Sequence, residues 1–288
     1  MIIVKIHGGL GNQLFQYAAG RALALHHCAE LVLDLSWFNN RPLGNTARKY
    51  ELYRYPIKAR ETTPAEQSMC RLYQGRLIRR IPLIGRKFRY GGEKYFQFDS
   101  NFFYYPNNTY LDGYWQSHRY FEGVSDCISA EFQAIEPPGD RNLRLIEEIQ
   151  STNSVALHIR RGDYLANPAA LNYHGVCPLD YYKRAVELVA SKAPKLHFYI
   201  FSDDLDWAES HLALQFPVTF VGHNKGDEAF QDLRLISLCR HQIIANSSFS
   251  WWGAWLNSNP GKIVIGPKKW FLVNKDTSTL FPPDWLKI

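Results

Sequence analysis

The sequence predicts an α/β protein built from two Rossmann-like domains that face each other across a cleft. In both halves of the 288-residue chain, short apolar segments alternate with segments in which apolar residues recur at the spacing of a helix. The predicted strands are continuous apolar runs, which is typical of strands buried on both faces of a parallel sheet. Because Pro137 and Pro138 continue neither a helix nor a sheet, we expect a boundary near them. With the segment after these prolines counted as the end of the first domain, the predicted domains are residues 1–150 and 151–288.

The first domain begins with a β-α-β pattern. Residues 2–6 are predicted to form a buried strand and residues 7–13 a turn. A helix then extends to about residue 26, and residues 31–35 form the second strand. This order is the usual start of a doubly wound domain. Between residues 39 and 106 the periodicity is weaker. The basic stretch 71–94 is interpreted either as a solvated helix and loop or as a surface for an anionic lipid or substrate.

The second domain repeats the β-α alternation more regularly. Strands are predicted over residues 155–159, 196–201, 218–221, 242–245 and 263–265. Helices are predicted over residues 179–192, 205–214, 228–239 and 250–256, and a loop is expected between residues 159 and 179. A parallel sheet follows from this order.

Composition restricts the classes of partner and compartment. The net charge of +6 favours an anionic partner such as a phosphate, a nucleotide, a nucleic acid or an acidic membrane surface. The five cysteines form no C-x-x-C pair, so a reducing compartment fits best. The sequence has neither a signal-peptide pattern nor an apolar run long enough to span a membrane. We expect a cytoplasmic protein with at most peripheral contact at the inner membrane face.

A glycine-rich turn follows the first predicted strand, at the strand end where ligands bind in open α/β sheets. Gly8, Gly9 and Gly11 would let backbone amides approach an anion at the start of the next helix. The pattern matches neither a dinucleotide fingerprint nor a Walker loop. A plain tight turn explains it equally well.

Two adjacent arginines follow the predicted strand 155–159. The guanidinium groups of Arg160 and Arg161 could each clamp a phosphate with two hydrogen bonds. The alternative is a structural pairing of one arginine with Asp163. For Arg161 this alternative has equal weight, because side chains 160 and 161 leave opposite faces of an extended segment.

Polar residues also follow the predicted strand 242–245. Asn246 or Ser247 can cap the next helix, whose first free N–H groups would form a second anion site; simple capping is the alternative. Asp232 lies on the preceding helix, where a carboxylate is on local grounds merely solvated.

An Asp-x-Asp pattern, the metal–diphosphate signature of some glycosyltransferases, occurs at Asp204 and Asp206. We favour the alternative that Ser202 or Asp203 caps the helix that starts near residue 205. The sequence shows neither a Ser-His-Asp triad nor a His-rich metal cluster, so no metal site is predicted.

Four motifs together resemble glycosyltransferase family 11, the α-1,2-fucosyltransferase family, in its bacterial form without a membrane anchor. They are His7-Gly8-Gly9-Leu10-Gly11-Asn12-Gln13-Leu14-Phe15-Gln16, Gly113-Tyr114-Trp115-Gln116-Ser117, His158-Ile159-Arg160-Arg161-Gly162-Asp163-Tyr164 and the segment 245–256 around Trp251-Trp252-Gly253. The resemblance implies a GT-B fold, GDP-β-L-fucose as donor and inversion at the anomeric carbon. It implies that domain 1–150 is the acceptor side and that domain 151–288 binds GDP-fucose. It also implies a galactose-terminated acceptor such as lactose, with no cofactor.

The resemblance also implies roles for individual residues. Arg160 would bind the β-phosphate, His158 and Asp232 would hold guanine, and the amides after Ser247 would cradle the diphosphate with help from the first glycine loop. A carboxylate is a natural acceptor for guanine N1–H and its 2-amino group. The complete predicted donor site is Gly8, Gly9, Gly11, Asn12, Gln13, His158, Arg160, Arg161, Asp232, Asn246, Ser247, Ser248 and Phe249.

Catalysis would depend on charge. As GDP departs, Arg160 would stabilise the negative charge on the leaving phosphate in place of a metal. The α-1,6 relatives have a catalytic glutamate a few residues past the motif, but residues 165–168 contain no acid. Asp163 is therefore the candidate general base by elimination, and His174 is the second candidate.

Two alternative functions belong to other classes of protein. The positive charge and interleaved aromatics would suit a nucleic-acid binder, although we expect no nucleic-acid partner; a catalytically silent sugar-binding protein would use the arginines for structure only. Within the family, another linkage, acceptor or GDP-sugar is the alternative, because the motifs read the nucleotide better than the sugar.

Overall fold

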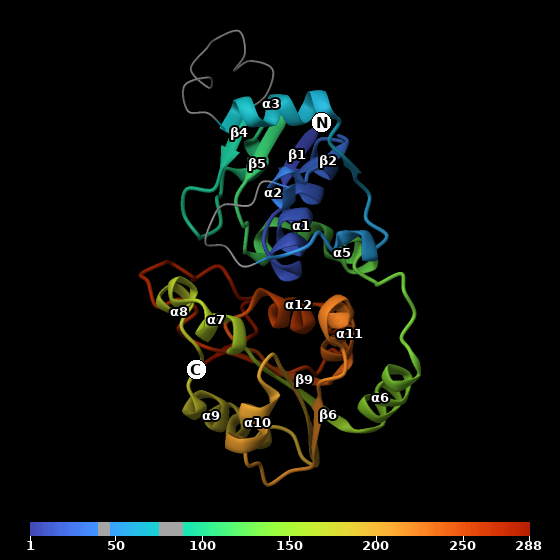
Figure 1. The fold of residues 1–288 in the computed structure, drawn as a ribbon, viewed down its shortest axis with the longest axis vertical. Coiled ribbons are helices and arrows are strands. Elements are labelled where there is room, and N and C mark those ends of the chain that lie inside the picture. Colours follow the sequence, from blue (N-terminus) through green and yellow to red (C-terminus); the bar gives the residue numbers. More distant parts are fainter. Residues whose placement is uncertain (40–46, 75–88) are drawn as a thin grey trace. The chain divides into compact units, whose positions relative to one another are not determined.

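The structure is a computed structural model that describes residues 1–39, 47–74 and 89–288. These residues form two compact units: Met1–Ile135 with Asp276–Phe281, and Glu136–Lys275 with Pro282–Ile288 (Figure 1). The boundary thus lies beside Pro137 rather than at residue 150. The reason is that helix α6 (Asp140–Ser151) packs its buried Leu145 and Ile149 into the core of the second unit. Most of the basic stretch 71–94 lies outside the described residues.

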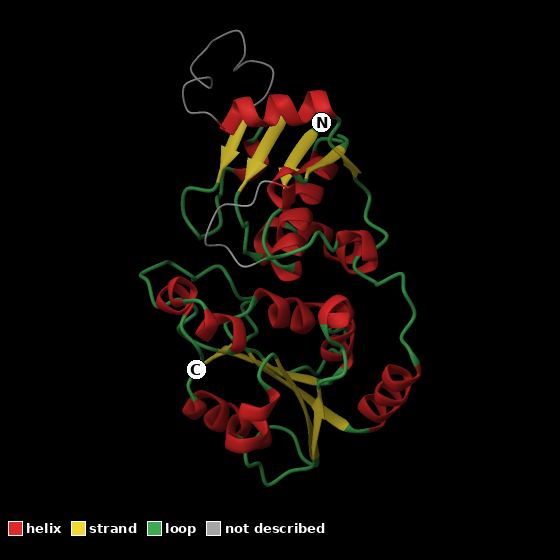
Figure 2. Ribbon diagram, viewed as in Figure 1, coloured by secondary structure: helices red, strands yellow, loops and turns green. Residues whose placement is uncertain are grey.

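The first unit contains a parallel sheet in the order β3-β2-β1-β5-β4 (Figure 2). Its strands are β1 (Ile2–Lys5), β2 (Leu31–Asp34), β3 (Arg60–Glu61), β4 (Arg89–Gly92) and β5 (Thr109–Asp112). Its helices are α1 (Leu10–His26), α2 (Ser36–Asn39), α3 (Pro64–Gln74) and α5 (Ser125–Glu131), with short 3-10 turns at Leu52–Arg54, Phe102–Tyr104, His118–Tyr120 and Glu122–Val124. The predicted β-α-β start is confirmed.

Close packing of α1 on the sheet depends on Gly20. A Cβ at this position would lie 2.2 Å from Cγ2 of Val4 in the central strand β1, so any side chain would push the helix away. Leu14, Ala18 and Leu23 of the same helix are completely buried. This packing fixes the start of α1, and with it the glycine loop, at the end of β1.

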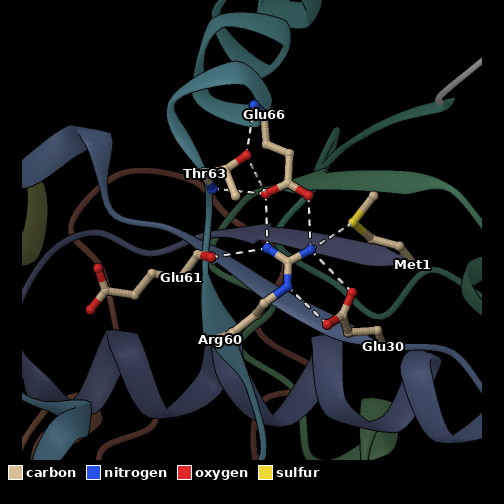
Figure 3. Close-up of polar contacts among 6 residues, drawn as sticks. All are labelled: Met1, Glu30, Arg60, Glu61, Thr63 and Glu66. Atoms are coloured by element: carbon tan, nitrogen blue, oxygen red, sulfur yellow. Dashed lines mark hydrogen bonds and ion pairs between the residues drawn. The ribbon is translucent and has the colours of Figure 1, made fainter.

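The edge of the first sheet is fixed by Arg60 of β3 (Figure 3). Its guanidinium group forms paired hydrogen bonds to Glu66, at 2.8 Å each, and further bonds to Glu30. Glu66 also accepts from the backbone N–H of Thr63, and the Thr63 hydroxyl accepts from the N–H of Glu66. This reciprocal capping box starts α3, with Pro64 at its first position.

The second unit contains a parallel sheet in the order β11-β10-β9-β6-β7-β8, which is the Rossmann order. Its strands are β6 (Asn153–Ile159), β7 (Leu196–Ser202), β8 (Val218–Val221), β9 (His241–Ile243), β10 (Val264–Gly266) and β11 (Leu286–Lys287). Its helices are α6, α7 (Gly162–Ala166), α8 (Pro168–His174), α9 (Leu179–Ala190), α10 (Leu205–His211), α11 (Ala229–Leu238) and α12 (Ser248–Leu256), with a 3-10 turn at Gly226–Glu228.

The central strands of this sheet are covered on both faces. Val155, Leu157 and Ile159 of β6 belong to the core formed with α9 and α10, whereas Ala156 belongs to the core formed with α6 and α11. This arrangement explains why the strands are continuous apolar runs, and it confirms the predicted doubly wound class. Of the parts of the chain that the structure describes, no helix is long and apolar enough to cross a bilayer.

The strand order reverses between β1 and β5 in the first sheet and between β6 and β9 in the second. Ligands of open α/β sheets bind at such switch points, beyond the carboxyl ends of the strands. Each of the four motifs continues from one of these four strands. The topology therefore pairs the motifs, two at each switch point.

Candidate active site

The switch point of the second unit brings together the end of β6 and the start of α12. His158 is the second-last residue of β6, and Arg160 and Arg161 directly follow the end of this strand. Phe249 lies in the first turn of α12, and its ring centroid is 5.9 Å from that of His158. The structure thus places the motif 158–164 and the motif 245–256, as predicted, at one edge of one sheet.

Arg160 is held by two carboxylates. Its Nη2 lies 2.5 Å from Oδ2 of Asp163, and its Nε lies 3.3 Å from Oδ2 of Asp203, which follows the neighbouring strand β7. Burial acts to raise the pKa of Asp203, but Arg160 and the N–H groups of Arg161 and Gly162 outweigh it, so that the pKa is lowered. A cation fixed in this way needs little reorganisation when negative charge develops nearby.

Arg161 is occupied by the loop after β7. Its Nε lies 3.6 Å from Oδ2 of Asp204, and its guanidinium carbon lies 4.0 Å from the centroid of the Trp207 ring, a cation–π arrangement. The two arginines therefore have different surroundings. The geometry favours the structural interpretation for Arg161 and leaves Arg160 as the candidate phosphate-binding cation.

The Asp-x-Asp segment caps a helix. Oδ1 of Asp204 accepts a hydrogen bond from the backbone N–H of Trp207 at 3.3 Å, so Asp204 is the N-cap of α10. The prediction of Ser202 or Asp203 as the cap is wrong by one or two residues, because α10 begins directly at Leu205; the Ser202 hydroxyl instead accepts from the N–H of Asp204. Within the described ranges, no group of three or more His, Cys, Asp or Glu residues could hold a metal ion.

His158 is a buried, neutral imidazole. Burial, followed by the charge of Arg160, lowers the pKa of His158 to about 3, and Asp203 opposes this shift. Its side chain is 5% exposed, and its Nδ1 has no hydrogen-bond partner among the residues that the structure describes. Because an unsatisfied buried polar atom is costly, this nitrogen is available to a ligand.

Asp232 is not a solvated helix acid. It lies in the first turn of α11, and its Oδ1 accepts a hydrogen bond from Nδ2 of Asn224 at 2.7 Å. Asn224 is in turn held by Asn142 through bonds of 2.9 and 3.1 Å. Burial raises the pKa of Asp232 to about 7, although the bond from Asn224 opposes the shift. A carboxylate that is oriented by the fixed amide of Asn224 and largely shielded from water is prepared for a ligand with hydrogen-bond donors.

The N-terminus of α12 is favourable for an anion. Ser247 is the N-cap residue but forms no side-chain cap bond within the described structure, and the first turn contains no acid. At the other end, Nζ of Lys262 donates to the carbonyls of Ala254 at 2.9 Å and Asn257 at 2.8 Å. The cation therefore stabilises the negative end of the helix dipole, while the positive end and its amides face the switch point.

Asn246, which directly precedes the N-cap residue of α12, is held by internal hydrogen bonds. Its Nδ2 lies within hydrogen-bond distance of the carbonyls of His174, Gly175 and Trp270, and its Oδ1 accepts from the thiol of Cys177. The side chain is 3% exposed, so these internal bonds occupy it. Asn246 thus positions the backbone at the start of α12. The prediction that its side chain contacts the nucleotide-sugar ligand directly does not fit this geometry.

The two candidates for a general base lie close to Arg160. Asp163 is paired with Arg160, and His174 stacks on Tyr164 with a centroid distance of 4.8 Å and an interplanar angle of 9°. Burial lowers the pKa of His174 to about 4, and the nearby charge of Asp163 opposes this shift. The segment that carries both residues is not the predicted loop: it forms α7 and α8, the second of which is capped by the side chain of Asn167.

The glycine loop of the first unit is a tight turn with a structural clamp. Gly8 has φ +79°, and a Cβ there would lie 2.8 Å from Nδ2 of Asn12. The Gln13 amide group donates to the carbonyls of Gly8 and Lys49 and accepts from the N–H of Glu51. Gln13 is fully buried, so its side chain holds the loop against the segment 49–51. Gly9 is the N-cap of α1, next to Gly11 and Asn12 in its first turn.

Asp203 and Asn224 are the positioning residues that sequence reasoning missed. The sequence pattern indicates Asp203 only as a helix cap, although this residue follows a strand next to β6 in the sheet. Only the position of β7 beside β6 shows that its carboxylate reaches Arg160. Asn224 lies in an irregular segment after β8, and nothing in its local pattern marks it as a partner of Asp232.

Two Rossmann-like units, with a fixed arginine and a helix N-terminus at the switch point of the second, have the construction of a GT-B glycosyltransferase. The chain belongs to glycosyl transferase family 11, whose model matches residues 86–288. The matched range includes three of the four motifs, and the resemblance inferred from the motifs is confirmed.

Two bacterial relatives match nearly the whole chain, and a human relative matches less than half of it. The O-antigen biosynthesis glycosyltransferase WbnK of Escherichia coli is 34% identical, over 98% of this chain and 99% of that protein. An alpha-1,2-colitosyltransferase of Escherichia coli is 32% identical, over 100% of this chain and 99% of that protein. Human galactoside alpha-(1,2)-fucosyltransferase 1 is 26% identical over 46% of this chain and 38% of the human protein. The chain is therefore a glycosyltransferase related to α-1,2-fucosyl- and α-1,2-colitosyltransferases.

Proposed function

We propose that this enzyme transfers L-fucose from GDP-β-L-fucose to the 2-hydroxyl of a terminal β-galactoside, with inversion and without a metal. The observation that carries the proposal is the set of groups at the second switch point. It combines a fixed cation at Arg160, the N-terminus of α12 with no acid in its first turn, a buried imidazole with an unsatisfied nitrogen at His158 and a shielded carboxylate at Asp232. This set is complementary to a guanosine diphosphate.

Asp232 accounts for the choice of nucleotide. Guanine presents two donors on one edge, N1–H and the 2-amino group, and a carboxylate can accept both. Adenine would present a bare acceptor nitrogen at the same place. The bond from Asn224 to Asp232 orients the carboxylate for this role.

Arg160 accounts for departure of the nucleotide. Breaking the bond between the anomeric carbon and the β-phosphate oxygen places negative charge on the diphosphate, which Arg160 and the α12 amides stabilise. Asp203 keeps the guanidinium in place while this happens. Metal ions are not needed in this scheme, because these groups supply the positive charge.

Asp163 accounts for activation of the acceptor. It shares Arg160 with Asp203 in the structure, and a bound diphosphate competes for the same guanidinium. Once the donor is bound, the Asp163 carboxylate is freed to accept the proton of the attacking hydroxyl. The hydroxyl oxygen then forms the new bond on the face opposite the departing GDP, which gives inversion.

A second donor is favoured by one specific finding. The α-1,2-colitosyltransferase matches the whole chain, whereas the human fucosyltransferase matches less than half of it. Colitose is L-fucose without the 3-hydroxyl group. Both donors carry GDP and both transfers form an α-1,2 linkage, so the nucleotide site described above serves either donor. A group that contacts the 3-hydroxyl decides between them.

The test is a transfer assay with matched donors. The purified protein is incubated with lactose and either GDP-fucose or GDP-colitose, released GDP is measured, and the linkage of the product is determined by NMR. We expect an α-1,2-fucosylated product and a higher kcat/KM with GDP-fucose. A preference for GDP-colitose would replace the donor and keep the mechanism. GDP binding without turnover on either donor, over a panel of galactosides, would identify a binding protein instead.

A further inference from the structure

The turn after β5 has a strained backbone. Trp115 has φ +55°, a left-handed conformation that a bulky residue rarely adopts. The indole is 1% exposed and packs against Phe102 and Tyr120, with centroid distances of 5.3 and 5.5 Å. Strain of this kind persists only where surrounding contacts enforce it, and it is often associated with a binding site.

Glu93, which directly follows β4, enforces this conformation. Its carboxylate oxygens accept hydrogen bonds from the backbone N–H groups of Tyr114 at 2.9 Å and Trp115 at 3.1 Å. A Cβ on Gly113 would lie 2.4 Å from Cβ of Glu93, so only glycine allows this approach. On the other side of the turn, Nε2 of Gln116 donates to Oδ1 of Asn12 at 2.7 Å. The turn is thus clamped between β4 and α1.

The consequence of the clamp is the orientation of Tyr114. While its neighbour Trp115 is buried, Tyr114 is 42% exposed and meets the ring of His7 edge to face at a centroid distance of 4.7 Å. His7 follows β1, and Trp37, in the helix after β2, lies 6.2 Å from His7. Three aromatic rings from three adjacent strand ends therefore gather at the switch point of the first sheet. We define Tyr114, His7 and Trp37 as the aromatic platform.

The chemistry of the platform suits an uncharged ring. Burial lowers the pKa of His7 to about 4, with Asp112 opposing, so the imidazole is neutral near pH 7. The two charged side chains that act on His7, Asp112 and Lys5, are paired with each other at 3.3 Å. Aromatic rings stack on the apolar C–H faces of sugars, and a neutral imidazole both donates and accepts hydrogen bonds with hydroxyl groups.

We propose that the aromatic platform binds the terminal hexopyranose of the acceptor and that Glu93 is the positioning residue of this platform. The proposal rests on the proposed function, because the sugar is taken to be the galactoside that receives the transferred residue. It assigns the acceptor to side chains of the first unit that do not contribute to the nucleotide site.

The first test separates acceptor binding from donor binding. We expect Tyr114→Ala to raise the KM for lactose at least tenfold and to leave the Kd for GDP within twofold, whereas Tyr114→Phe keeps most of the affinity. Tyr104→Ala is the matched control, because Tyr104 is 83% exposed outside the platform, and its lactose KM should not change. An unchanged lactose KM in Tyr114→Ala would overturn the proposal.

The second test concerns Glu93. Glu93→Gln keeps the size of the side chain but replaces one acceptor oxygen with a donor, so the two N–H groups are no longer both satisfied. We expect the lactose KM to rise at least fivefold with little change in kcat or in the Kd for GDP. A merely structural role would instead lower the melting temperature and weaken lactose and GDP binding together, and that result would remove Glu93 from the proposal.

The third measurement distinguishes failure of the platform from failure of the proposed transfer. Saturation-transfer NMR detects lactose bound to the wild type in the presence of GDP, whether or not transfer occurs. Lactose binding that is lost in Tyr114→Ala supports the platform even if no product forms. Lactose binding that is equal in both proteins, or absent from both, overturns the platform.

Discussion

Arg160 and Asp163 form an ion pair with 2.5 Å between Nη2 and Oδ2, within one motif at the carboxyl end of β6. The cation proposed to stabilise the leaving group therefore holds the carboxylate proposed to accept the proton. Asp203 contacts the same guanidinium from the neighbouring strand end, so Arg160 stays anchored when a diphosphate takes the place of Asp163. This arrangement favours binding of the donor before activation of the acceptor.

Arg161→Ala should reduce stability and spare nucleotide binding. The change removes the ion pair with Asp204 and the cation–π contact with Trp207, which together contribute about 1–2 kcal/mol. Urea unfolding measures the loss, with GDP affinity determined on the folded protein. Arg184→Ala is the control, since it removes an exposed pair with Asp180 and should cost far less. Lost GDP affinity at unchanged stability would instead place Arg161 in the donor site.

Chelation should leave turnover unchanged. Asp204, the first acid of the Asp-x-Asp pattern, pairs with Arg161 and caps α10, and the preceding Asp203 contacts Arg160, so these two carboxylates are already engaged. Initial rates in excess EDTA should equal those in Mg²⁺ or Mn²⁺. Activity that is lost with EDTA and restored by Mn²⁺ would show that a metal binds the diphosphate here.

The affinity for GDP should depend on pH through Asp232. The guanine donors need the ionised carboxylate, whereas burial raises the pKa of Asp232 to about 7. The Kd for GDP should therefore be constant above pH 8 and should rise by about tenfold per pH unit well below pH 7. Isothermal titration between pH 5.5 and 8.5 measures this profile. A flat profile would argue against a contact between Asp232 and the base.

Asp232→Asn should weaken GDP binding without lowering the stability of the fold. We expect GDP affinity to fall at least tenfold, about 1.4 kcal/mol, and the preference for GDP over ADP to narrow, because the amide satisfies only one of the two guanine donors. A carboxyl group whose pKa is raised on folding stabilises the fold at low pH, and this contribution is lost as the pH rises through 7. The variant should therefore melt no lower than the wild type at pH 8. Glu228→Gln, which removes an exposed charge beside the same helix, is the control and should bind GDP normally.

The sequence predicts the elements that are buried on both faces and misses those that depend on distant contacts. The strands β6 to β10 are found within a few residues, because their apolar runs meet helices on both sides. The strand β3 has only two residues, one of them Arg60, and it exists because Glu30 and Glu66 hold that arginine at the sheet edge. The helices α7 and α8 bury none of their residues completely, so apolar periodicity does not reveal them.

The same distinction applies to the site. The motifs at the ends of β6 and β9 indicate His158, Arg160 and the start of α12 directly, because these two strands are neighbours at the switch point of the second sheet. The contacts of Asp203 with Arg160 and of Asn224 with Asp232 join residues from different elements. No local pattern encodes them, and only the folded chain shows that each carboxylate or amide reaches its partner.

The most direct test of this account is the kcat of Arg160→Lys with GDP-fucose and lactose. Lysine keeps the positive charge but lacks the planar fork that can stay on Asp203 while it exchanges Asp163 for the departing phosphate. We predict a fall in kcat of about 10²–10³-fold, with circular dichroism and the melting temperature close to those of the wild type. A folded Arg160→Lys enzyme with near-normal kcat would contradict the claim that Arg160 stabilises the leaving group.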